Sequence, residues 1–143
     1  MAEAEQSFNF ELISPEQKLI SEPAYMAVIP GEEGEFGVMA SHASLISSIK
    51  PGVVSIFKEK DDKNPRRIFT AGGFADVTNE QCSVLVEEAI DVKDLNSSEL
   101  AQMRRNLEED LTLAETRIDK ARIEKNLSLV KAKLQAVTGT VIG

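Results

Sequence analysis

Apolar and polar residues alternate near the start of the chain. Phe8, Phe10 and Leu12 are interleaved with polar residues, a period of two that predicts a strand with one buried face. Further short apolar runs follow at regular spacing, at residues 25–29, 53–57, 67–70, 74–77 and 83–86. Many short strands with frequent turns favour an antiparallel β-sandwich or a flattened barrel. No helix-length pattern separates these runs, which argues against a parallel α/β sheet.

Turn residues separate the apolar runs. Pro-Gly pairs at 30–31 and 51–52, Gly72-Gly73 and Asn79-Glu80 mark chain reversals, because these residue types favour turn conformations. The segment 58–65 is almost entirely charged and ends in Pro65. It cannot supply a core, so we expect a solvent-exposed loop between two antiparallel strands.

The periodicity changes after residue 93. Asn96 followed by Glu99 is typical of a helix start, with the side chain of each capping the other's backbone N–H. Apolar residues then recur at helical spacing in two stripes: Leu100, Met103, Leu107, Leu111; and Ile123, Leu127, Val130, Leu134, Val137. The sequence therefore predicts two domains, a β-sandwich over 1–93 and a C-terminal α-helical hairpin over 94–143.

The position of the hairpin turn is less well defined. Ile118 and Ile123 are five residues apart, which breaks the phase between the two stripes and favours a turn near this point. Thr112 with Glu115 offers a second capping box there. The region contains no Gly or Pro, so one long continuous helix stays open as the alternative.

Charge and composition narrow the function. The net charge is −8, and all of the excess lies in residues 1–93, which argues against nucleic acid as a partner. No apolar run approaches the roughly 20 residues that span a bilayer, and the acidic N-terminus does not resemble a secretory signal. Cys82 is the only cysteine, and we expect a buried, inert thiol.

Residues that could carry catalysis are sparse. His42 is the only histidine, so a zinc site has no second imidazole, and a hydrogen-bonded structural role is expected for it. Neither a Gly-x-Ser-x-Gly elbow nor a phosphate-binding loop is present. Gly31, Gly34 and Gly37 are evenly spaced, but the glutamates between them would repel a phosphate, which favours turn geometry.

The segment around these glycines resembles a known family. Residues 29–31, 34–37, His42 and 49–52 read Ile-Pro-Gly, Gly-Glu-Phe-Gly, His and Ile-Lys-Pro-Gly. This layout is similar to the epsilon subunit of the rotary proton-translocating ATP synthase of bacterial type, as are residues 10–15 and 72–74. Ser41 and Ser44 depart from the Gly and Pro that often flank the histidine in that family.

The resemblance implies a non-catalytic subunit of the central stalk. Such subunits couple the gamma subunit to the c-subunit ring, and their C-terminal helices can regulate ATP hydrolysis through contacts with the alpha and beta subunits. No cofactor is required. A position peripheral to the membrane, at the cytoplasmic face of the inner (plasma) membrane, is implied.

The resemblance also implies particular site residues. Glu35, with Gly34, Phe36 and His42, matches the family positions at the c-ring interface. Without that match, Glu35 would be interpreted as a solvated loop carboxylate.

A second motif bears on nucleotide binding. Ile118, Asp119 and Arg122 resemble the motif with which some bacterial epsilon subunits contact ATP, so ATP as a regulatory ligand is one hypothesis. The match departs at Ile123 and at Leu129, where the family has Ala and Arg. An ordinary exposed Asp–Arg pair on a helix is the alternative.

One other class of function fits the pattern. A free-standing β-sandwich adaptor could use a coiled helical hairpin to bind an unrelated protein. Recovery of neither gamma nor c subunits in a pull-down would favour this adaptor hypothesis.

Overall fold

The computed structural model describes residues 7–139. They divide into two compact units, with the boundary between Asp91 and Val92.

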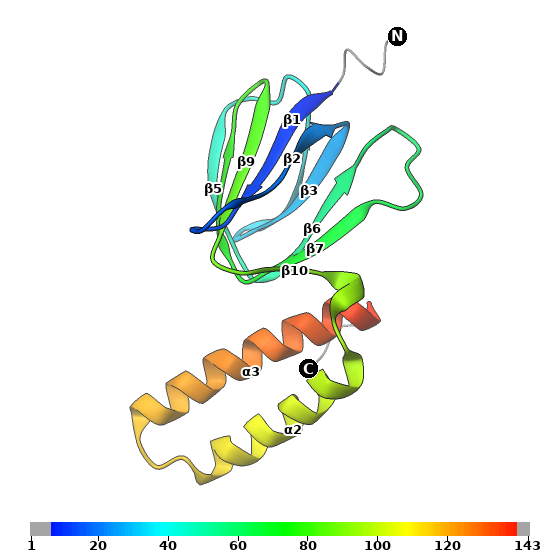
Figure 1. The fold of residues 1–143 in the computed structure, drawn as a ribbon. Helices are drawn as coiled ribbons and strands as arrows, with labels where there is room; N and C mark the ends of the chain where they lie inside the picture. Colours follow the sequence, from blue (N-terminus) through cyan, green and yellow to red (C-terminus); the bar gives the residue numbers. More distant parts are fainter. Residues whose placement is uncertain (1–6, 140–143) are drawn as a thin grey trace. The chain divides into compact units, whose positions relative to one another are not determined.

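The described residues of the first unit form ten strands, and Figure 1 shows how most of them are arranged. They form a β-sandwich, as the sequence predicts. The strands are β1 (Phe8–Ile13), β2 (Lys18–Ala24), β3 (Met26–Gly31), β4 (Gly34–Met39), β5 (Leu45–Ile49), β6 (Gly52–Phe57), β7 (Arg66–Thr70), β8 (Gly73–Val77), β9 (Gln81–Val86) and β10 (Ala89–Asp91).

The strand order is β10-β7-β6-β3-β5-β8-β9-β1-β2, with β4 paired to β3 outside this path. Neighbouring strands run antiparallel except for β1 and β9, which are parallel from Asn9–Gln81 to Ile13–Leu85. The sequence pattern predicts antiparallel pairing alone, and this parallel pair is the exception. β1 and β9 are far apart in the sequence, so no tight turn fixes their relative direction.

The alternating residues of β1 lie in the core. Phe8, Phe10 and Leu12 are almost fully buried, and each such side chain contributes about 1.5–3 kcal/mol when removed from water. The core of this unit is formed by residues between Phe8 and Val86, with Ala89 packed against it.

The charged segment 58–65 joins β6 and β7, which are antiparallel neighbours, as expected. Asp62 organises it: Oδ2 accepts from the Lys58 backbone N–H at 3.0 Å and Oδ1 from that of Asn64 at 2.9 Å. These two hydrogen bonds lower the pKa of Asp62. The loop is thus shaped by its own polar groups rather than by burial.

The second unit contains a short 3₁₀ helix, η1 (Val92–Asp94), and the helices α2 (Ser97–Leu113) and α3 (Arg117–Thr138). The hairpin prediction is confirmed, and the alternative of one continuous helix is wrong. Asn96 caps α2, since its Oδ1 accepts from the Glu99 N–H at 3.0 Å.

The second predicted capping box is wrong. Thr112 Oγ1 donates to the carbonyl of Glu109 at 2.7 Å and so lies inside the last turn of α2. Thr116 caps α3 instead, because its hydroxyl accepts from the Asp119 N–H at 3.1 Å. At the other end, Gly139 adopts the left-handed conformation and donates to the Gln135 carbonyl, which closes α3.

The apolar stripe of α3 is buried as predicted, at Ile123, Leu127, Val130 and Leu134. The α2 stripe is weaker: Leu100 is buried, whereas Met103 is 47% exposed. Leu100, Val130 and Leu134 form the centre of a small core, joined by Leu95, Leu107 and Val137.

Candidate interaction surfaces

The turn between β3 and β4 presents three glutamates. Glu32 and Glu33 form the turn, and Glu35 follows on β4; all three are exposed. Gly34 has φ +131°, a conformation that side chains rarely adopt. A Cβ on Gly31 would lie 2.8 Å from the Gly34 carbonyl oxygen. Turn geometry therefore accounts for these two glycines.

A groove begins at this acidic turn. Its volume is about 590 Å³, and its lining comes from both sides of the gap between β4 and β5: Gly31, Glu32, Glu33, Gly34, Glu35, Phe36, Leu45, Ile46, Ser47 and Ser48. Phe36 is partly buried and packs against the core. The groove is thus acidic at the turn and apolar along Leu45 and Ile46.

His42 lies away from the acidic turn. Glu35 is at the start of β4 and His42 lies three residues beyond the end of that strand, so at least about 13 Å of extended chain separates them. His42 Nδ1 is 2.6 Å from the Ala43 carbonyl oxygen. The structure therefore brings Gly34, Glu35 and Phe36 together, but it does not bring His42 to them.

Ser41 precedes that histidine in an unusual backbone conformation. Its φ of +65° makes it the only described non-glycine residue with positive φ. Its N–H donates to the Asn79 carbonyl at 2.9 Å. This conformation costs an L-residue about 1–2 kcal/mol, which explains why a glycine suits this position.

An apolar patch lies on an outer face of the sandwich. Phe74 on β8 and Leu85 on β9 are direct cross-strand partners, and they are 56% and 46% exposed. Ile46 on β5 is 72% exposed. The direct partner of Phe74 on β5 is Ser48, and Ile46 lies two residues before Ser48, so it is the diagonal neighbour of Phe74 on the same face. We call Ile46, Phe74 and Leu85 the outer patch.

Sequence reasoning missed the outer patch. A usable signal existed, since Phe74 and Leu85 are apolar residues at outward positions of the runs 74–77 and 83–86. Exposed apolar side chains gathered on one face mark interaction sites.

A polar network lies on the neighbouring strands β1, β2 and β9. Glu11 Oε2 is 2.7 Å from Lys18 Nζ and 3.4 Å from Ser21 Oγ. Gln81 Nε2 donates to Glu11 Oε1 at 2.8 Å and to Ser83 Oγ at 3.0 Å. The hydrogen bond from Lys18 is the main reason why the pKa of Glu11 is lowered.

The residues of the nucleotide motif lie at the start of α3. Asp119 Oδ1 is 3.6 Å from Arg122 Nη2, and the two side chains are 51% and 65% exposed. Ile118 is 80% exposed. All three therefore lie on the surface next to the hairpin turn, with the carboxylate and the guanidinium within reach of one ligand.

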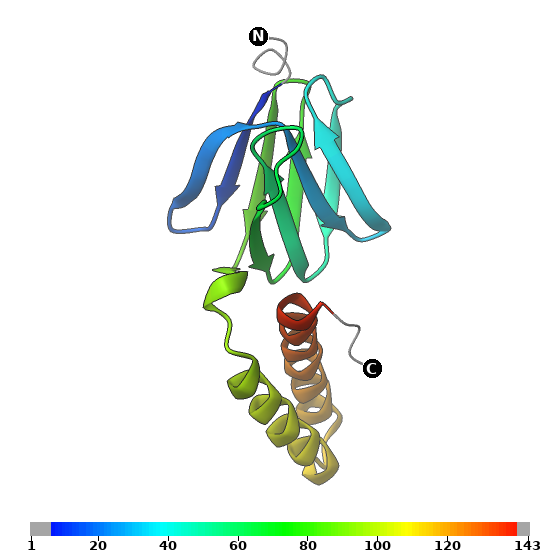
Figure 2. The same ribbon diagram turned by 90° about the vertical axis from the view of Figure 1, so that its right-hand side faces the viewer.

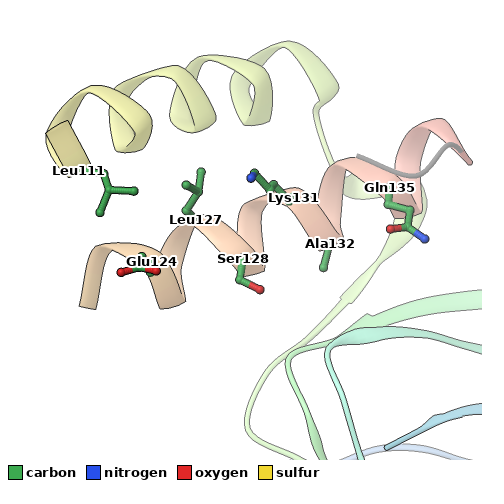
Figure 3. A pocket seen from close by; sticks show the side chains of 7 residues that line it. All are labelled: Leu111, Glu124, Leu127, Ser128, Lys131, Ala132 and Gln135. Carbon is green, nitrogen blue, oxygen red and sulfur yellow. The ribbon is translucent and has the colours of Figure 1, made fainter. Parts of the chain in front are cut away.

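A second groove lies along α3, beside α2. Its volume is about 480 Å³, and it is lined by Leu111, Glu124, Leu127, Ser128, Lys131, Ala132 and Gln135. Figure 3 shows Leu111 and Leu127 pointing toward each other between the helices, whereas Ser128 and Ala132 point away from α2. Asp119 and Arg122 do not line this groove.

The chemical groups that could react are few. Cys82 is buried as expected, and burial raises the pKa of its thiol to about 12, with the Asp76 carboxylate acting in the same direction. Within residues 7–139, no three His, Cys, Asp or Glu side chains are grouped so as to hold a metal ion. Over the same residues, neither helix has the length and apolar content to cross a membrane.

These observations define a protein built from a β-sandwich and a helical hairpin, each of which carries candidate contact surfaces. The family model of the ATP synthase delta/epsilon chain β-sandwich domain matches residues 7–92. This chain belongs to the ATP synthase epsilon-chain family and is accordingly a non-catalytic subunit of an ATP synthase. The membership replaces the adaptor hypothesis.

The curated relatives support this membership over nearly the whole chain. The ATP synthase epsilon chain of Rhodospirillum centenum is 40% identical over 131 residues, which cover 90% of each chain. That of Mesorhizobium japonicum is 39% identical over 142 residues, covering 99% of this chain and 98% of the relative.

Solved structures share the fold at lower identity. A chain of the Euglena gracilis mitochondrial ATP synthase, in a structure that includes the c ring, has a TM-score of 0.78 at 19% identity, with 88% of this chain and 78% of that chain covered. A chain of the Tetrahymena thermophila mitochondrial ATP synthase, in a structure of its central stalk and c ring, has a TM-score of 0.64 at 16% identity, with 92% and 96% covered.

Proposed function

We propose that this subunit belongs to the central stalk and couples the gamma subunit to the c-subunit ring, at the cytoplasmic face of the inner membrane. Family membership supports this role. Both similar structures are of assemblies that include the c ring, and the Tetrahymena assembly is a central stalk with its c ring. A packed sandwich suits the task, because a close-packed interior transmits strain.

The outer patch is the observation that carries the proposal. Ile46, Phe74 and Leu85 are exposed on one face, and the Glu11 network lies on the strands beside them. An apolar centre with a polar border is the usual composition of a protein interface. We assign this face to the gamma subunit.

The test is a charge introduced at the centre of the outer patch. Phe74→Glu should weaken binding to purified gamma subunit by about thirtyfold, the loss expected of an aromatic anchor worth ~2 kcal/mol. Met39→Glu is the matched control, since Met39 is 41% exposed on β4, outside the patch. Equal affinity of both variants and the unchanged chain would contradict the assignment.

The acidic turn is assigned to the c ring. Glu35, Gly34 and Phe36 lie together beside Glu32 and Glu33, and a basic loop would complement them. Such complementarity sets orientation and association rate more than affinity. Glu35→Gln should therefore reduce the salt dependence of binding to isolated c rings, whereas Glu16→Gln, on an exposed loop at a distance in sequence, should not. His42 stays a predicted c-ring contact at a second position, because it lies beyond the far end of β4.

The helical unit is assigned a regulatory role, through contacts with the alpha and beta subunits. It has its own small core and joins the sandwich through η1. An element of this kind can occupy two positions that differ by only a few kcal/mol.

ATP as a regulatory ligand stays a prediction. The Asp119 carboxylate can accept from an adenine amino group or a ribose hydroxyl, and the Arg122 guanidinium can pair with phosphate. An ATP titration should shift the amide resonances of both residues, and Arg122→Ala should abolish the shift. Arg104→Ala is the control, because Arg104 is similarly paired, with Glu108 at 3.5 Å on α2. Absence of any shift would leave the pair as an ordinary surface contact.

A further inference from the structure

Two strand edges face each other across the groove at the acidic turn. Among the described strands, β4 pairs only with β3. β5 pairs with β8 along its length but with β3 only at Gly31–Ile49. In Figure 2, β4 (cyan) forms an outer margin of the sandwich. The groove of about 590 Å³ lies between these two edges.

Main-chain groups of both strands point into this open side. The Pro30 carbonyl accepts from the Lys50 N–H at 2.9 Å, so it points away from β4. Pro30 is paired with Glu35 on β4. In an antiparallel pair, opposite residues either exchange both main-chain hydrogen bonds or exchange none, and the two kinds of pair alternate along the strands. The N–H and C=O of Glu35, and those of Gly37 two residues later, therefore point away from β3.

The main-chain groups of β5 alternate in the same way. The Ser48 carbonyl accepts from the Glu32 N–H at 3.0 Å, so the main-chain N–H and C=O of Ser48 point away from Phe74, its partner on β8. Two residues earlier, the N–H and C=O of Ile46 therefore point the same way. Unpaired donors and acceptors thus line both sides of the groove.

The β4 edge carries less protection against pairing than the other edges. Natural edges are blunted by Pro, charged side chains (Lys above all), bulges or shortness, and the only charged residue of β4 is Glu35. The β2 edge has Lys18, Pro23 and a register irregularity in its pairing with β1, and β10 has only three residues. By contrast, β4 keeps an unbroken six-residue register with β3 and contains neither Pro nor Lys.

We propose that this groove binds an extended segment of another subunit of the ATP synthase, which adds a strand to β4. The segment carries Lys or Arg beside Glu32, Glu33 and Glu35, and an apolar side chain against Phe36 and Leu45. Backbone hydrogen bonds supply the affinity and the side chains the selectivity, as in other cases of strand addition. The source of the segment rests on the proposed function, whereas the binding itself does not.

The test uses the full chain and a capped heptapeptide of alternating lysine and valine. We expect the peptide to slow hydrogen exchange of the Glu35, Gly37 and Ile46 amides about tenfold or more. A peptide N-methylated at every residue has the same charge but no main-chain N–H donor, so it cannot form the strand pairing and should give no protection. The peptide with glutamate in place of lysine should not bind.

One variant pair tests the location. Ile46→Lys places a cation on the open side of β5 and should weaken peptide binding about tenfold. Leu19→Lys, at an apolar position 37% exposed on β2, should bind as the unchanged chain does. Equal binding of the methylated peptide, or unchanged exchange of the three amides, would overturn the proposal.

A second measurement separates this proposal from the stalk assignment. Hydrogen exchange of the assembled ATP synthase should show the same three amides protected relative to the free subunit. Assembly without this protection would overturn strand addition and leave the coupling role intact. A subunit that binds the peptide but binds neither gamma nor the c ring would overturn the coupling role and leave strand addition intact.

Discussion

Gly73 is the residue whose backbone leaves least room for a side chain. Its φ is +154°, and a Cβ there would lie 2.0 Å from the Leu85 carbonyl oxygen. Gly73→Ala should therefore destabilise the sandwich by about 3 kcal/mol, because both the conformation and the clash must be relieved. Urea unfolding followed by circular dichroism measures this change.

Gly37→Ala is the control for that substitution. Gly37 has no strained φ, and a Cβ at this position would have Met26 Sδ, at 3.9 Å, as its nearest neighbour. Its unfolding midpoint should shift by less than about a quarter of the Gly73→Ala shift. Equal shifts would show that loss of glycine flexibility, rather than the close approach to Leu85, sets the cost.

Glu11 gives a prediction that depends on pH. Its folded pKa is lowered, chiefly by Lys18, so the ionised form is favoured in the folded state. The resulting stability is present above the unfolded pKa of about 4.3 and is lost as pH falls through the folded pKa. Glu11→Gln should lower the unfolding midpoint at pH 7 and flatten its decline below pH ~4.3.

Glu16→Gln provides the comparison for Glu11, since Glu16 is an exposed carboxylate on the loop before β2. It should retain the acid-side decline of the unchanged chain. If the two variants lose stability in parallel as pH falls, the Lys18–Glu11 contact does not contribute to folding.

Some of these residue-level features could be read from the sequence and some could not. The burial of Phe8, Phe10 and Leu12 follows from their spacing, and a buried Cys82 is expected because no histidine or cationic cluster is adjacent to it in the sequence. The Glu11 network could not be predicted, because Gln81 is 70 positions from Glu11. Nothing local indicates that β1 lies beside β9.

At the scale of elements, Thr116 decides where α3 begins. Its hydroxyl satisfies the Asp119 N–H, and loss of such a cap costs about 1 kcal/mol. Thr116→Ala should therefore speed hydrogen exchange of the first-turn amides of α3 about fivefold. Thr112→Ala should leave them unchanged, because that hydroxyl bonds within α2. A larger effect from Thr112 would restore the capping box that its sequence position suggests.

Two of the strands that escaped prediction, β2 and β4, share a physical cause. β4 contains Gly34 and Gly37, and β2 contains Pro23; glycine and proline are poor strand formers in isolation. Their strand conformation comes from pairing with β3 and β1. The helices were predictable because helical periodicity and capping residues are features of neighbouring positions in the sequence. The start of α3 was not, since Thr112 and Thr116, four residues apart, are both possible caps. The candidate surfaces were predictable only in part, since the acidic turn is one segment while the outer patch combines three strands.

At the scale of the whole molecule, the two units have separate cores. Among the described residues, each unit has an apolar cluster of its own, and a chain ending at Lys93 retains every residue of the sandwich cluster. The truncated chain should therefore still bind the gamma subunit and the c ring, because both contacts are assigned to the sandwich. A truncated chain that fails to bind gamma would show instead that the helices contribute to docking.

The same truncation tests regulation in the assembled enzyme. If the hairpin can occupy a position that opposes ATP hydrolysis, its removal should raise hydrolysis by about two- to tenfold, the effect of a bias up to ~1.4 kcal/mol between two states. Proton-driven ATP synthesis should persist, because the sandwich still joins the rotor parts. Synthesis lost together with hydrolysis would mean that the truncation breaks the coupling. This subunit has no catalytic role, so removal of its helices can speed hydrolysis only if the hairpin opposes hydrolysis in one of its positions. Unchanged hydrolysis with intact synthesis would therefore restrict the subunit to mechanical coupling.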